Sequence, residues 1–60
     1  MRVVVADDAV ILREGLVRLL VELGFEVVGT AGDASELLRL TAATKPDVAI
    51  VDIRMPPTHT

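Results

Sequence analysis

Unbroken runs of apolar residues mark two segments of the chain, Arg2–Ala6, where the run begins at Val3, and Val48–Val51. Both runs are rich in β-branched residues, and neither alternates with polar ones. Such runs are typical of strands that are buried on both faces, as in a parallel sheet covered by helices. Glu26–Ala31 is a weaker candidate of the same kind, so the pattern predicts three strands.

A helical period separates the first two predicted strands. Leucines recur at spacings of four, three, one and three, at Leu12, Leu16, Leu19, Leu20 and Leu23. This spacing predicts a helix over residues 9–23 with a leucine stripe on its core-facing side. The charged residues of the segment fall mostly elsewhere and are Arg13, Glu14, Arg18 and Glu22. Gly24 stands where a left-handed residue ends a helix, and Phe25 can pack back on the last turn.

A second helix is predicted after Asp33, whose side chain can cap it, with Glu36 as the reciprocal partner of a capping box. Its expected inward face consists of Ala34, Leu37, Leu38 and Thr41. Residues 45–47, Lys-Pro-Asp, then return the chain to the last strand. The order strand, helix, strand, helix, strand predicts right-handed crossovers and an open, parallel α/β sheet. Segment 53–60 is polar and contains prolines, and we interpret the sequence as a domain cut in mid-course.

Composition narrows the class of protein. Hydrophobic residues make up 52% of the 60-residue chain and charged residues 25%, which argues against a disordered tail. With no Cys and one His, neither disulfides nor a structural zinc site is expected to compensate for the thin core. A formal net charge of -3 argues against nucleic-acid binding by this segment. No signal peptide or membrane-spanning run is present, so we expect a soluble, cytoplasmic protein.

Three carboxylates stand directly after two of the predicted strands: Asp7 and Asp8 after the first, and Asp52 after the third. If the first strand lies between the other two, all three acids border the crevice at the carboxyl ends of the strands. Adjacent strands lie about 4.8 Å apart, so these carboxylates can reach one Mg²⁺ ion. Close anions repel one another, so the cluster is expected to need a cation, and oxygen donors favour Mg²⁺ over Zn²⁺.

A simpler alternative is that each acid is a cap. Asp7 or Asp8 could cap the first helix, and Asp52 could cap a turn. That alternative does not explain why two consecutive acids and a third converge on one crevice. We therefore favour the metal site, provided that the first strand is central.

Three segments resemble a known family. Residues 3–8 are Val-Val-Val-Ala-Asp-Asp, residues 13–16 are Arg-Glu-Gly-Leu, and residues 46–56 are Pro-Asp-Val-Ala-Ile-Val-Asp-Ile-Arg-Met-Pro. Together they resemble the start of response-regulator receiver domains, most of all the LuxR/NarL type. The resemblance covers the whole chain and implies a flavodoxin-like (CheY-like) doubly wound sheet with strand order second, first, third. It also implies that residues 1–60 are the N-terminal half of a receiver, with its remainder and any C-terminal helix-turn-helix domain absent.

By this resemblance, Asp52 is the phosphoacceptor, Asp8 a direct Mg²⁺ ligand and Asp7 an acid that holds a coordinating water. The backbone carbonyl of Arg54 matches the remaining protein ligand of the metal. The implied reaction transfers a phosphoryl group from a phosphohistidine of a sensor histidine kinase to Asp52, with Mg²⁺ as cofactor. The chain is then a phosphoacceptor and not an enzyme, and its parent regulates transcription through a separate DNA-binding domain.

Receiver domains are expected to continue beyond this length and to supply a fourth-strand Ser or Thr and a fifth-strand Lys that bind the phosphoryl group. Thr58 and Thr60 follow the acceptor too closely to be that hydroxyl, and Lys45 precedes it. The implied site is therefore half of the family's site, and His59 is assigned no role. In receivers the outer face of the first helix commonly docks the kinase, and the candidates for that surface are Val10, Ile11 and Val17.

A second function left open is an interaction module. Without a fourth strand, the third strand is an apolar edge that could pair with a second copy of the chain. A phosphatase with an aspartyl nucleophile is more remote, because such enzymes typically carry a second Asp where this chain has Arg54. A dinucleotide-binding fragment is also remote, because residues 7–10, Asp-Asp-Ala-Val, stand where a Gly-rich loop should be.

Overall fold

Strands and helices alternate along the chain. The structure is a computed structural model, and it describes residues 1–52. The elements are β1 (Arg2–Ala6), α1 (Val10–Glu22), β2 (Glu26–Ala31), α2 (Ala34–Thr44) and β3 (Val48–Val51). All five predicted elements are confirmed. Neither helix within residues 1–52 has the length and hydropathy needed to cross a membrane.

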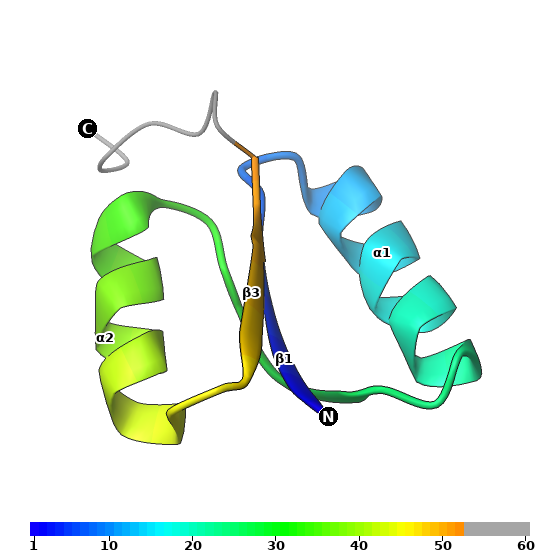
Figure 1. Ribbon diagram of the computed structural model, residues 1–60. Helices are drawn as coiled ribbons and strands as arrows, with labels where there is room; N and C mark the ends of the chain where they lie inside the picture. Colours follow the sequence, from blue (N-terminus) through cyan, green and yellow to red (C-terminus); the bar gives the residue numbers. More distant parts are fainter. Residues whose placement is uncertain (53–60) are drawn as a thin grey trace.

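The three strands form one parallel sheet in the order β2-β1-β3. β1 is central, and its last residue, Ala6, lies opposite Ala31 of β2 and Val51 of β3. The two helices lie on opposite sides of this sheet (Figure 1). The predicted doubly wound α/β sheet with order second, first, third is confirmed. Because all strands run the same way, the residues that follow them meet at one edge of the sheet.

β1 is the most deeply buried element, as its unbroken valine run predicts. Val4 and Val5 are 0% exposed and Val3 is 2% exposed. Val3 and Val5 form a cluster with Leu20 of α1. The partly buried side chains packed against this cluster are Leu16, Val17, Phe25, Val27 and Ile50. The core between the sheet and α1 therefore centres on β1. This buried strand anchors the acidic loop that follows it, which consists of Asp7 and Asp8.

The leucine stripe of α1 is only partly buried, which corrects the prediction for this helix. Leu20 is 8% exposed, but Leu12, Leu19 and Leu23 are 60%, 51% and 65% exposed. The half-buried positions of the helix are Arg13, Leu16 and Val17. Since α1 packs against β1 and β2, its buried face is rotated from the middle of the stripe toward Arg13, a residue expected on the outer side.

The end of α1 follows the predicted pattern. Gly24 adopts a left-handed backbone with φ of +93°. The amide of Gly24 donates to the carbonyl of Val21, and the amide of Phe25 donates to the carbonyl of Leu20, both at 3.0 Å. These two bonds make a Schellman motif, which satisfies carbonyls that the helix end leaves unpaired. Phe25 packs against the core as expected, and this contact fixes the chain direction into β2.

α2 begins at its predicted cap, but the prediction that Leu38 belongs to its inward face is wrong. Asp33 Oδ1 accepts a hydrogen bond from the amide of Glu36 at 2.8 Å. Within residues 1–52, no bond from the Glu36 side chain completes the capping box. Leu38 is 70% exposed, whereas Leu40 packs on Gly29 of β2. Residues two apart lie about 200° apart around a helix, so Leu40 faces the sheet and Leu38 faces away.

Candidate metal centre

Backbone pairing aligns the ends of the three strands. The amide of Asp52 donates to the carbonyl of Ala6 at 3.0 Å, and the amide of Asp7 donates to the carbonyl of Ala31 at 3.0 Å. Asp7 and Asp52 are thus tied to neighbouring strands one residue beyond the paired positions of Ala6. The central position of β1 places its two acids beside Asp52.

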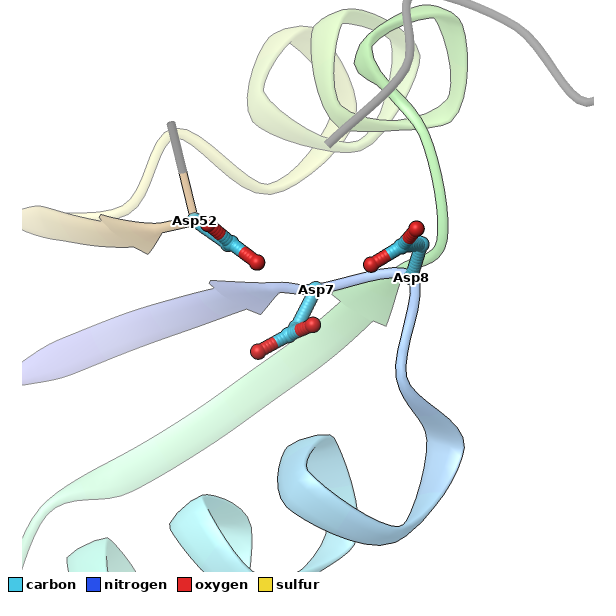
Figure 2. Close-up of side chains that lie close together, drawn as sticks. All are labelled: Asp7, Asp8 and Asp52. Carbon is cyan, nitrogen blue, oxygen red and sulfur yellow. The ribbon is translucent and has the colours of Figure 1, made fainter. Parts of the chain in front are cut away.

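The three carboxylates form a compact cluster. One oxygen from each of Asp7, Asp8 and Asp52 lies within 4.8 Å of the others. Figure 2 shows the side chains of Asp8 and Asp52 directed toward each other past the end of β1. Asp7 is buried, Asp52 is half-buried and Asp8 is exposed. The structure therefore brings the three predicted acids together at an edge that is open to solvent.

The geometry and the donor chemistry suit a small divalent cation. Like charges at this spacing repel by roughly 1 to 4 kcal/mol per pair, depending on how far water screens them. Mg²⁺ takes oxygen ligands at about 2.0 to 2.1 Å, so two of its ligands lie at most about 4.2 Å apart. Side-chain rotation can bring oxygens spaced by up to 4.8 Å within that limit, and an acid that stays farther away can hold the ion through a coordinated water. These acids therefore fit the ion that their sequence positions predict.

Local hydrogen bonds hold Asp7 and decide against the capping alternative at the first helix. Asp7 Oδ1 accepts from the amide of Ala9 at 2.9 Å. Ala9 is the N-cap of α1 and makes no side-chain cap bond, so this bond secures the residue ahead of the helix and caps no amide of its first turn. Asp8 accepts no hydrogen bond within residues 1–52. Neither acid is a conventional cap of α1.

Arg13 is the residue of this region that sequence reasoning missed. Its Nη1 atom donates to the backbone carbonyl of Asp7 at 2.9 Å and to that of Ala31 at 3.5 Å. A charged residue three positions before the core-facing Leu16 was the available signal, because residues at that spacing share a helical face. The regular spacing of the leucines instead predicted a buried face that left Arg13 on the outer side of the helix.

Other predicted site residues differ in outcome. Val10 and Ile11 are 54% and 85% exposed, as expected for an outer surface of α1. Val17 is half-buried and packs against the core, so its assignment to that surface is wrong. Arg54, whose carbonyl is the predicted fourth ligand group, lies outside the described residues.

Comparison with known proteins agrees with this geometry. The family model of the response regulator receiver domain matches residues 3–59. The chain belongs to this family. Its receiver resembles that of a transcriptional regulatory protein NarL from Mycobacterium tuberculosis, with 52% identity over 56 residues that cover 92% of this chain. The transcriptional regulatory protein PdtaR from the same organism is 44% identical over 55 residues.

A solved receiver has the same backbone arrangement. The signal receiver domain of NarL from Mycobacterium tuberculosis superposes with a TM-score of 0.88 at 52% sequence identity, over 92% of this chain and 45% of that one. The expected family and fold are confirmed. The chain spans about a quarter of the length of the curated relatives, 26% of NarL and 27% of PdtaR.

Proposed function

We propose that this chain is the phosphoacceptor part of a two-component response regulator, with Asp52 as the acceptor. The single observation that carries the proposal is the meeting of Asp7, Asp8 and Asp52 within 4.8 Å at the strand ends of a receiver fold. In the proposed reaction, an oxygen of Asp52 forms a bond to phosphorus while the bond from phosphorus to a kinase histidine nitrogen breaks. The product is an acyl phosphate on Asp52, and the histidine is returned unphosphorylated.

Asp7 and Asp8, which directly follow β1, would hold the metal for this transfer. We assign Asp8 as a direct Mg²⁺ ligand, Asp7 as the acid that holds a coordinating water, and Asp52 and the carbonyl of Arg54 as further ligands. When bound, Mg²⁺ supplies positive charge that offsets the charge of the phosphoryl oxygens. Asp7 is suited to a fixed supporting position because it is buried and hydrogen-bonded at both its carboxylate and its carbonyl.

We further propose that residues 1–60 are the N-terminal half of the receiver in a longer, cytoplasmic, DNA-binding regulator. The names of the relatives support this, since they include transcriptional regulators and the DNA-binding transcriptional activator DevR/DosR, which is 41% identical over 56 residues. A sensor histidine kinase would be the phosphoryl donor. In this proposal the chain acts as a phosphoacceptor and not as an enzyme, and the Ser or Thr and the Lys expected to bind the phosphoryl group would come from the other half.

Intact mass spectrometry after incubation with a small acyl-phosphate donor and Mg²⁺ tests the acceptor. We expect a low yield of one added phosphoryl group on wild type, because the stabilising Lys and hydroxyl are not part of this chain, and none on Asp52→Asn. Asp47→Asn, at the other end of β3, is the matched control and should label like wild type. Equal labelling of wild type and Asp52→Asn would rule out Asp52 as acceptor.

A second candidate function is self-association, and the state of β3 favours it. β3 pairs with β1 alone among the described strands, and Val48 and Val51 are 40% and 41% exposed. An apolar edge strand without a Lys or Pro to protect it can pair across a two-fold axis. Size-exclusion chromatography with light scattering should then show a homodimer, and a monomer throughout a dilution series would refute this candidate.

A further inference from the structure

The guanidinium of Arg13 links α1 to the ends of two strands. Its Nη1 atom reaches the carbonyl of Asp7 at 2.9 Å and that of Ala31, the last residue of β2, at 3.5 Å. The amide of Asp7 already donates to the same Ala31 carbonyl at 3.0 Å. Arg13 therefore contacts the Asp7 backbone on the β2 side, whereas Asp52 approaches the acidic loop from β3.

These bonds leave the Asp7 peptide little freedom. Its amide, its carbonyl and one carboxylate oxygen each have a partner: Ala31, Arg13 and Ala9. The Asp7 carbonyl belongs to the peptide that leads into Asp8, so the bond from Arg13 restrains the rotation that would carry the exposed Asp8 side chain away from the other acids. Asp8 has no hydrogen bond of its own within residues 1–52, so its position depends on that peptide.

We propose that Arg13 is a positioning residue for the acidic cluster: by holding the Asp7 carbonyl, it fixes the spacing of the carboxylates and strengthens divalent-cation binding. This inference rests on the proposed metal site. Residues that orient metal ligands typically change metal affinity by about 10 to 100-fold when they are removed. The bond is charge-assisted, which makes it stronger and better directed than a neutral one.

The sign of the effect separates positioning from charge. A guanidinium close to a cation site repels the cation, so if Arg13 acted through its charge alone, Arg13→Ala would tighten Mg²⁺ binding. If Arg13 acts by holding the loop, the same change weakens binding. The side chain borders an open hollow of about 420 Å³ that is also lined by Glu14, Val17, Arg18 and Thr30. Truncation therefore enlarges a solvent-exposed space and leaves the core cluster of Val3, Val5 and Leu20 intact.

Isothermal titration with Mg²⁺ on wild type, Arg13→Ala, Arg13→Lys and Arg18→Ala tests the proposal. We expect Arg13→Ala to bind about tenfold more weakly. Arg13→Lys should be intermediate, because Lys keeps a charged donor, but its compact ammonium on a flexible stem does not reproduce the fixed N–H directions of the guanidinium nitrogen that contacts both carbonyls. Arg18→Ala removes the same charge from the same hollow and should bind like wild type or slightly more tightly. Unchanged or tighter binding by Arg13→Ala would overturn the proposal.

Amide hydrogen exchange on the metal-free chain supplies a readout that does not depend on the metal site. Arg13→Ala should speed exchange at Asp7 and Ala9 while leaving Val4, in the middle of β1, unchanged. A general loss of stability would instead speed all three alike. If wild type shows no saturable Mg²⁺ binding, the proposed metal site fails. If exchange at Asp7 and Ala9 is unaltered, the role of Arg13 fails whatever the metal does.

Discussion

The three acids at the strand ends differ in how the fold holds them. Asp7 is buried, and its amide, carbonyl and carboxylate all take part in hydrogen bonds. Asp8 is exposed and accepts no hydrogen bond within residues 1–52. Asp52 is half-buried and is tied through its amide to Ala6. Removing the charge of Asp8 therefore changes electrostatics with the least disturbance of structure.

Asp8→Asn should raise the melting temperature of the metal-free chain by a few degrees and weaken Mg²⁺ binding. The amide keeps the size of the side chain but relieves its repulsion with Asp7 and Asp52. Thermal melts followed by circular dichroism, with and without Mg²⁺, measure both effects. Glu14→Gln is the control, since it removes a carboxylate from the exposed part of α1 and should leave the melting temperature nearly unchanged. A metal-free Asp8→Asn chain that melts below wild type would contradict a cluster of mutually repelling acids.

Close packing between α2 and β2 explains why Leu40, and not the predicted Leu38, faces the sheet. A Cβ atom on Gly29 would lie 2.6 Å from Cδ1 of Leu40 and 3.2 Å from its Cγ. β2 also carries one extra residue here, because Val3 pairs with Val27 while Val4 pairs with Gly29. The missing side chain at Gly29 thus lets α2 approach β2 through Leu40.

Two glycine substitutions should therefore shift stability in opposite directions. Gly29→Ala should lower the free energy of unfolding by about 1 kcal/mol or more, because Leu40 must move. Gly15→Ala should raise it by about 0.5 to 1 kcal/mol, because Gly15 lies inside α1 and a Cβ there meets nothing within 4 Å. Urea unfolding followed by circular dichroism measures both. Stabilisation by Gly29→Ala would show that α2 does not pack on β2 in this way.

The sequence predicted the elements better than the faces that they bury. The valine run of β1, the cap at Asp33 and the glycine after α1 are local signals, and each appears in the structure as expected. Which side of α1 turns inward is decided by the strands that it covers, and these are β1 and β2. Leu12, Leu19 and Leu23 consequently remain exposed, while Arg13 reaches the strand ends. Periodicity alone does not contain that information.

At the scale of the whole molecule, the strand order converts sequence positions into a site. Asp8 and Asp52 are far apart in the chain, and only the central place of β1 in the order β2-β1-β3 brings them together. The shared edge was predictable because unbroken apolar strands alternating with helices favour a parallel sheet whose strand ends lie together. The central place of β1 was predicted by the resemblance to receiver domains and not by the hydrophobic pattern. The part played by Arg13 was not predictable, because it depends on the rotation of α1 about its own axis.

Titration of the ¹⁵N-labelled chain with Mg²⁺, followed by NMR of the backbone amides, tests the central claim most directly. We expect saturable shifts confined to the amides around Asp7, Asp8 and Asp52, and their loss in Asp8→Asn. Weak, non-saturating shifts spread over acids far from the carboxyl ends of the strands, such as Glu22 and Asp47, would show that the clustered carboxylates do not form a metal site.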